Sequence, residues 1–202
     1  MKLSLALAST SLALLSTIAA CGKDDKGGGG PAAAPAVALD LAGINALVPE
    51  TLKAKVTFEK AEIKRERGRR TAVFTLAAPK GWTQKQKDFS TLSPADQEGM
   101  FGTSIDVGTN CDGVCQPKDW AAVSDKSNFS QFKDAKILKD EKTATSRLMI
   151  AEMSDKTYVQ HATWVAGAKR YSTCMVTLKD EYREAAPAFA KACQSVSLSG
   201  DD

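Results

Sequence analysis

The C-terminal third of the chain contains three consecutive strand patterns, which constrain the fold more than any other feature. Residues 146–154, 158–165 and 169–178 are apolar-rich segments of strand length. Only the tight connections 154–156 and 166–167 separate them, and connections this short join antiparallel neighbours. The pattern therefore predicts a three-stranded antiparallel meander.

A second pair of strands is expected nearer the N-terminus. Residues 55–63 and 71–76 both have strand patterns, and the second alternates cleanly through Phe74 and Leu76. Glu66-Arg67-Gly68 supplies the residues of a turn between them. We expect the two segments to form a β-hairpin.

Helices and two further strands are predicted from spacing and cap chemistry. The predicted strands are 102–107, which leads into a turn at 110–113, and 195–199. The predicted helices are one with Asp40 as N-cap and Pro49 as stop, one starting at residues 93–96, one opened by Pro117, and one starting near Pro187.

Grouped strands with helices at the ends and between them predict an α+β domain built on an antiparallel sheet. Two stretches resemble the PsbP-like family. They are Phe74-Thr75-Leu76 through Pro79-Lys80-Gly81-Trp82, and Tyr171 to Leu178 followed by the helix and strand of residues 189–198. The resemblance implies an α-β-α sandwich. That family is mostly non-catalytic and docks to other proteins, so the resemblance implies no active-site residues.

The N-terminus has the features of an export signal. Lys2 precedes an uncharged apolar run, residues 3–20, that ends in small residues and is too marginal for a transmembrane helix. Residues 18–21, Ile-Ala-Ala-Cys, resemble the lipobox of bacterial lipoproteins. The resemblance implies that Cys21 is acylated, with palmitate or a similar chain, and becomes the new N-terminus. The alternative is a simple secretory signal peptide in which Cys21 is incidental.

A tether follows the expected lipid anchor. Residues 22–36 contain four consecutive glycines followed by Pro and Ala, a composition that forms no core and reaches about 20 Å as a flexible coil. We therefore expect a signal peptide at 1–20, a lipidated Cys and tether at 21–36, and a single globular domain at 37–202. The expected location is the cell envelope, anchored to a membrane and facing the periplasm or the exterior, with inner or outer membrane left open.

The four other cysteines predict disulfides, because an exported domain with an even number of cysteines usually pairs them. Three pairings are possible for four cysteines. We favour Cys111 with Cys115, which bracket an Asp-Gly turn, and Cys174 with Cys193, which would link the last long strand to the C-terminal helix. Each short loop should contribute about 2 to 3 kcal/mol.

The alternative for these cysteines is a metal or redox site. Its soft ligands would be Cys111, Cys115 and His161, and its hard ligands Asp106, Asn110 and Asp112. The spacing matches neither a zinc motif nor an EF-hand loop, and a thioredoxin-like centre needs two residues between its cysteines. The sequence therefore predicts no metal and no cofactor.

Catalytic signatures are also missing from the sequence. His161 is the only histidine and lies inside a strand pattern, and no G-x-S-x-G motif occurs. The glycine run 27–30 precedes no Lys-Ser or Lys-Thr, so it is not a phosphate-binding loop. We expect a structural histidine and a protein that is not an enzyme.

A basic cluster at the tip of the predicted hairpin is the strongest charge feature. Its side chains are Lys64, Arg65, Arg67, Arg69 and Arg70, offset only by Glu66. Such a cluster could contact anionic lipid headgroups or an acidic partner, because each basic residue adds about 1 kcal/mol near a charged membrane. The alternative is a solvated turn. The small net charge of +3 predicts no nucleic-acid partner.

These features predict a lipid-anchored, non-enzymatic binding or scaffolding module of the bacterial cell envelope. Its expected partners are the membrane, through the N-terminal lipid, and an envelope protein or anionic lipid. The alternative is an envelope enzyme or a metal or redox protein with an unrecognised site. Trp82 and Trp120 are candidates for an exposed docking patch, and burial in the core is the other interpretation.

Overall fold

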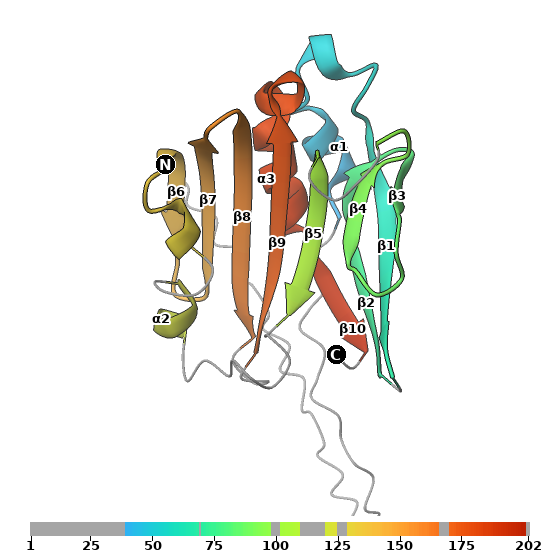
Figure 1. Ribbon diagram of the computed structural model, residues 1–202, viewed down its shortest axis with the longest axis vertical. Helices are drawn as coiled ribbons and strands as arrows, with labels where there is room; N and C mark the ends of the chain where they lie inside the picture. The colour runs from blue at the N-terminus through green and yellow to red at the C-terminus, as the bar shows by residue number, and fades with distance from the viewer. Residues whose placement is uncertain are drawn as a thin grey trace, which may run out of the picture. The chain divides into compact units, whose positions relative to one another are not determined.

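The computed structural model describes residues 39–68, 70–97, 102–109, 120–124, 129–165 and 170–200. Within these ranges the strands form two antiparallel sheets (Figure 1). The larger has the order β3-β4-β5-β9-β8-β7-β6 and the smaller the order β1-β2-β10. The expected signal peptide, Cys21, the tether, Cys111 and Cys115 lie outside the described residues.

The predicted meander forms the centre of the larger sheet. It consists of β7 (Ser146–Met153), β8 (Lys156–Val165) and β9 (Arg170–Lys179), paired in sequence order. Ser154, in the connection from β7 to β8, has φ 57°, the positive φ that two-residue hairpin turns require. The edge strand β6 (Lys136–Lys142) pairs with β7 on one side, and β5 (Ser104–Thr109) pairs with β9 on the other.

The predicted hairpin forms most of the smaller sheet. Its strands β1 (Phe58–Arg67) and β2 (Arg70–Pro79) are longer than expected, and Arg67 pairs with Arg70 across the turn. Gly68 has φ 61°, which an L side chain would resist. The last strand, β10 (Ser197–Gly200), pairs with β2.

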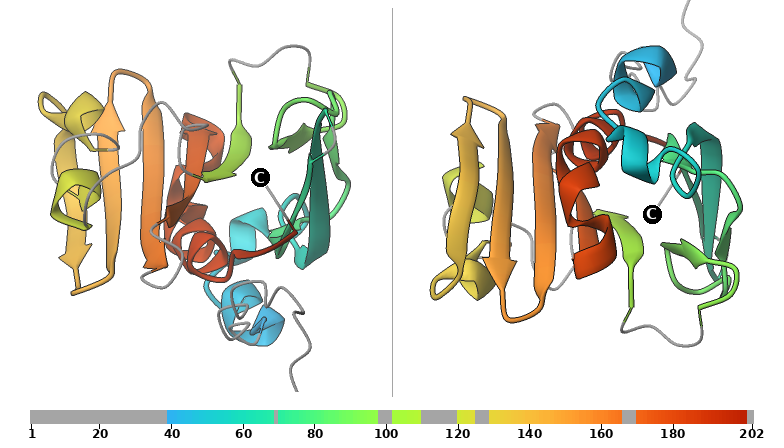
Figure 2. Two further views of the ribbon diagram at one scale, coloured as in Figure 1. Left: turned by 90° about the horizontal axis from the view of Figure 1, so that it is seen from below. Right: turned by 90° about the horizontal axis from the view of Figure 1, so that it is seen from above.

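The main core lies where α3 (Ala186–Gln194) packs against β8, β9 and β2 (Figure 2). As predicted, α3 has Pro187 in its first turn, and its inward residues include Phe189, which is fully buried. The Phe189 ring lies 5.0 Å from that of Phe58 and 5.7 Å from that of Trp82. The 3-10 helix η5 (Asp180–Ala185) leads into α3. The helix α1 (Leu41–Asn45) packs against α3.

A second, smaller core covers the opposite face of the larger sheet. Here α2 (Trp120–Ala122) and the 3-10 helix η3 (Ser130–Phe132) lie on the apolar side chains that β7 and β8 turn to that face. Met149 and Ala151 face this core, whereas Leu148 and Ile150 face α3, as the period-two alternation of a strand requires. Because the described helices on this face are so short, the α+β fold is rich in strands, and its described residues do not form the full helical layer that an α-β-α sandwich implies.

Three local predictions differ from the structure. Residues 93–96 are not a helix, because β4 (Thr91–Pro94) pairs with β3 (Trp82–Gln84) and β5. The first helix ends at Asn45, before the predicted stop at Pro49, and η1 (Glu50–Leu52) follows that proline. The exposed, highly charged strand β6 was missed, because an edge strand does not need an apolar face.

No helix in the described ranges is long and apolar enough to cross a lipid bilayer.

Candidate functional site

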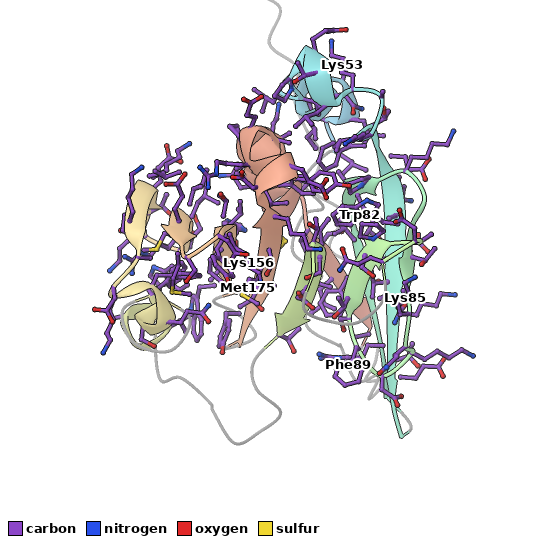
Figure 3. The ribbon with its side chains drawn as sticks, turned by 45° about the horizontal axis from the view of Figure 1, so that its top comes forward. Lys53, Trp82, Lys85, Phe89, Lys156 and Met175 are labelled. Carbon is purple, nitrogen blue, oxygen red and sulfur yellow. A yellow bond between two sulfur atoms is a disulfide. The ribbon has the colours of Figure 1, made fainter. Side chains whose placement is uncertain are left out.

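The candidate site is a groove of about 320 Å³ on the face of the larger sheet that points away from α3. Two adjacent cross-strand rows form its floor. In the first row Met175 of β9 lies between Asp106 of β5 and Gln160 of β8, and Met175 is labelled in Figure 3. In the second row Thr173 pairs with Gly108. The groove therefore draws on three strands that come from two separate parts of the chain.

The hollow depends on Gly108 and on η3. A Cβ atom at Gly108 would lie 3.1 Å from the Thr173 hydroxyl oxygen, so glycine leaves space that a side chain would occupy. Gln131, on η3, closes another side of the groove, and its Nε2 atom donates a hydrogen bond to the Met175 sulfur at 3.6 Å.

Among the described residues that line the groove, Asp106 is the only charged one. Its carboxylate accepts a hydrogen bond from the Thr91 hydroxyl and another, at 3.0 Å, from the Ser104 hydroxyl. A carboxylate offers about four acceptor positions. The two hydroxyl groups therefore orient Asp106 without using its full capacity.

Gln160 carries the least satisfied polar group of the groove lining. Only 4% of the residue is exposed, and its Oε1 atom is buried with no hydrogen-bond partner in the described part of the chain. Leaving such a group unpaired costs about 1 to 3 kcal/mol. An unpaired amide oxygen is the kind of defect that a functional site retains and a purely structural sheet does not require.

Sequence analysis missed Gln160, Gln131 and Thr173 and considered Asp106 only as a metal ligand. Gln160 alternates with apolar neighbours in its strand and so looks like a solvent-facing residue. The one available signal was Gly108, because a glycine inside a strand pattern often marks a close approach or a hollow.

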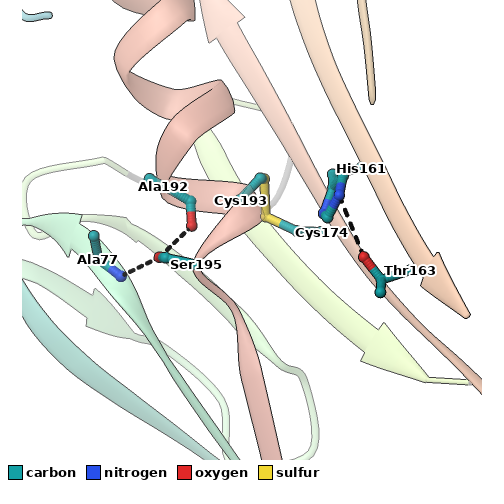
Figure 4. The surroundings of a disulfide bond; sticks show 7 residues. All are labelled: Ala77, His161, Thr163, Cys174, Ala192, Cys193 and Ser195. Atoms are coloured by element: carbon teal, nitrogen blue, oxygen red, sulfur yellow. Dashed lines mark hydrogen bonds between the residues drawn. A yellow bond between two sulfur atoms is a disulfide. The ribbon is translucent and has the colours of Figure 1, made fainter. Parts of the chain in front are cut away.

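The Cys174–Cys193 disulfide is confirmed, with a Cα–Cα distance of 5.4 Å (Figure 4). It links β9 to the end of α3 within the main core. Ser195 adds a second link there, since its hydroxyl accepts a hydrogen bond from the Ala77 amide at 3.3 Å and donates one to the Ala192 carbonyl at 2.6 Å. Cys111 and Cys115 lie outside the described residues, so their pairing stays a prediction.

His161 lies beside this disulfide, because it pairs with Cys174 across β8 and β9. Its Nε2 atom is 3.3 Å from the Thr163 hydroxyl. Burial lowers its pKa from 6.5 to about 4, against a smaller opposing effect of a hydrogen bond with the Cys193 backbone. Neighbouring residues in a strand face opposite sides of the sheet, so His161 points away from the groove that Gln160 lines.

The basic cluster does not point outward as a whole. Arg65 is only 9% exposed, and its guanidinium lies 5.6 Å from the centre of the Phe74 ring. The prediction that Arg65 belongs to a contact surface at the hairpin tip is therefore wrong, because alternation along β1 places it on the same face as the buried Ile63. Lys64 is exposed, and the side chains of Arg67, Arg69 and Arg70 lie outside the described residues.

The two tryptophans of the proposed docking patch are both partly buried. Trp82 packs against the main core, whereas Trp120 packs against the smaller core and donates a hydrogen bond from Nε1 to the Thr143 carbonyl at 3.3 Å. The core interpretation fits both residues better.

In the described ranges no group of three or more His, Cys, Asp and Glu side chains could hold a metal ion.

No family model matches the chain, and no curated protein matches it. Among solved structures, the chain is similar to the solution structure of cyanobacterial PsbP (CyanoP) from Synechocystis sp. PCC 6803. The identity is 9%, the TM-score is 0.40, and the match covers 62% of this chain and 85% of that chain. This likeness is weak, in line with the resemblance noted in the sequence, and it carries no argument about function.

Proposed function

We propose that the protein is a lipid-anchored, non-enzymatic binding module of the bacterial cell envelope, and that the groove over β5, β9 and β8 is its binding site. The single observation that carries the binding function is the Oε1 atom of Gln160, a residue of the groove lining, which is buried and has no hydrogen-bond partner among the described residues. A bound molecule would supply the missing hydrogen bond, which makes binding favourable relative to the empty groove.

The lining favours binding over catalysis. It combines Asp106, Thr173, Gln131 and Gln160 with Met175 and the small residues beside them. The one histidine of the chain lies on the other face of the sheet, so it is not within reach of the Thr173 hydroxyl as a general base. Polar groups that converge beside an apolar wall suit recognition of a small molecule or of a partner's side chain.

The groove is tested by screening a mixture of small polar compounds against the mature protein by nuclear magnetic resonance. Compounds that bind should shift the backbone amide signals of Asp106, Gln160 and Met175 together. Gln160→Met should weaken this binding, whereas the control Gln194→Met, at an exposed position in α3, should leave it unchanged. If no compound shifts these signals, the groove is not a binding site and the proposal fails.

The anchor is tested by labelling cells with radioactive fatty acid. The wild-type protein should incorporate label at Cys21 and sediment with membranes, and Cys21→Ser should do neither, because two or more acyl chains are needed for stable anchoring. An unlabelled wild-type protein that still sediments with membranes would contradict the lipoprotein assignment.

The basic hairpin is proposed as a secondary contact with anionic lipid, now without Arg65. Replacing Arg67, Arg69 and Arg70 by Ser should weaken binding of the unacylated Cys21→Ser protein to anionic vesicles. Added salt should weaken vesicle binding of the Cys21→Ser protein that keeps these three arginines, because salt screens the charges. The neutral replacement of the exposed Lys55, which lies shortly after η1, by Ser serves as the control. If the protein ignores anionic vesicles at low salt, the cluster is only a solvated turn.

A further inference from the structure

The hydrogen-bonding groups of the groove indicate the chemistry of what it binds. We infer that the groove accepts an alkylammonium group, from a small diamine or from a lysine side chain of a partner protein. This inference rests on the proposed binding function and specifies its ligand class.

The charge of the lining favours a cation. Asp106 is acidic, and the part of the lining that the structure describes contains no Lys, Arg or His. An anion placed beside the Asp106 carboxylate would be repelled, whereas an ammonium group would form charge-assisted hydrogen bonds, which are about twice as strong as neutral ones.

The spare hydrogen-bonding capacity of the groove consists mainly of acceptors. The Gln131 Nε2 atom donates one of its two N–H groups to the Met175 sulfur, and the amide oxygen of Gln131 is an acceptor with no bond from the described residues that line the groove. Asp106 receives two hydroxyl donors and can accept further bonds. Gln160 adds an amide whose buried oxygen has no donor among the described residues. These acceptors favour a molecule that brings donors, and an ammonium group brings three.

The spacing of the floor suits an extended alkyl chain. Asp106 and Gln160 lie on either side of Met175 in one row, so their Cα atoms are about 10 Å apart, or two strand spacings. The flexible Met175 side chain supplies an apolar surface between them. An ammonium at Asp106 would leave its alkyl chain over Met175 and a second polar group near Gln160.

The test compares three five-carbon probes that differ in charge: 1,5-diaminopentane, 1,5-pentanediol and glutarate. Each is titrated into the mature protein at low salt, and the amide signals of Asp106, Met175 and Gln160 are followed. Only the diamine should shift them, and its affinity should fall as salt is added. A parallel titration with N-acetyl-lysine amide distinguishes the two sources, since tighter binding than the diamine indicates a lysine side chain and weaker binding indicates a free diamine.

Two variants locate the contact. Asp106→Asn should weaken diamine binding about tenfold or more, because one charge-assisted hydrogen bond lost corresponds to at least that factor. Asp155→Asn, in the exposed turn between β7 and β8, is the matched control and should bind as the wild type does. Gln160→Met provides a second test should Asp106→Asn fail to fold, and it should also weaken diamine binding.

The outcomes separate this inference from the proposed function. If the diol or glutarate shifts the groove signals as strongly as the diamine, the groove is a binding site but its preference for a cation is wrong. If the diamine binds equally well to Asp106→Asn and Gln160→Met, it binds elsewhere and the inference is also wrong. If neither these probes nor any compound of the wider screen shifts the groove signals, both the inference and the binding function fail.

Discussion

Asn45 and Phe58 exchange two hydrogen bonds between a side chain and a backbone. The Asn45 Nδ2 atom donates to the Phe58 carbonyl at 3.0 Å, and the Phe58 amide donates to Asn45 Oδ1 at 2.7 Å. The last residue of α1 thus binds the first residue of β1 as a neighbouring strand would. This pair holds α1 against the smaller sheet.

Asn45→Ala should lower the free energy of unfolding by about 1 to 3 kcal/mol, because it leaves both backbone groups of Phe58 without these partners. Asn45→Asp keeps the acceptor and should lose less. The control is Glu50→Ala, whose side chain is 85% exposed in an ion pair with Lys53 and should change stability by less than about 1 kcal/mol. Urea unfolding measures all three. Equal stability of Asn45→Ala and wild type would mean that water replaces both bonds.

The Cys174–Cys193 disulfide should contribute about 3 kcal/mol to stability, because it closes a loop with a sequence separation of 19. Replacing both cysteines by Ala should reveal that loss in urea unfolding. The double replacement of Cys111 and Cys115 tests the other predicted pair. Peptide mapping without reductant should recover one peptide pair joined at 174–193 and another at 111–115. Free thiols at positions 111 and 115 would show that the second disulfide does not form.

Stability should fall between pH 6.5 and pH 4 because of His161. Its folded-state pKa of about 4 lies below the ordinary 6.5, so below pH 6.5 the unfolded chain binds a proton that the folded chain excludes. At pH 5 this difference amounts to about 2 kcal/mol. His161→Gln removes the titrating group, so its loss of stability between pH 7 and pH 5 should be smaller by about that amount. Parallel pH dependence of the two proteins in urea unfolding would show that the ring can protonate in the folded state.

Arg147 should not tolerate replacement by Lys. Its guanidinium binds the Asp140 carboxylate through two bonds of 2.9 and 2.7 Å, donates to the Ser124 carbonyl, and lies 4.5 Å from the centre of the Phe129 ring. The hydrogen bond from Arg147 is also the main reason that the pKa of Asp140 is lowered. Lysine keeps the charge but cannot make the paired contacts, so Arg147→Lys should cost about 1 to 2 kcal/mol in thermal or urea unfolding. The exposed control Lys133→Arg should be neutral, and an equally neutral Arg147→Lys would show that charge alone suffices.

Gln160→Met should raise the free energy of unfolding by about 1 kcal/mol while it weakens binding in the groove. The substitution removes a buried amide that has no partner for its oxygen in the described chain and replaces it with an apolar side chain of similar length. Such a trade between stability and function is common at binding sites. A destabilised Gln160→Met would instead indicate that the amide already has a partner, and would weaken the case for a site.

Local patterns predicted much of the fold. The β1–β2 hairpin, the β7–β8–β9 meander and the start of α3 at Pro187 each depend on alternation, short turns and a proline within one stretch of chain. The Cys174–Cys193 disulfide was predictable because its cysteines lie in two elements that follow each other closely along the chain, β9 and α3. The burial of Arg65 could also have been predicted from the sequence, since the alternation of a strand places Arg65 on the same buried face of β1 as Ile63.

The groove and the long-range strand pairings within each sheet were decided only by tertiary structure. Pairing β10 with β2 and β5 with β9 brings together segments far apart in the sequence, and such contacts depend on how the whole core closes rather than on local propensity. The sequence around Gln160 would show the same strand pattern whether its side chain faced solvent or a hollow. Whether its amide meets solvent, a neighbour or a hollow is settled by η3 and by Gly108 on a distant strand, because a side chain's hydrogen bonds depend on what packs against it.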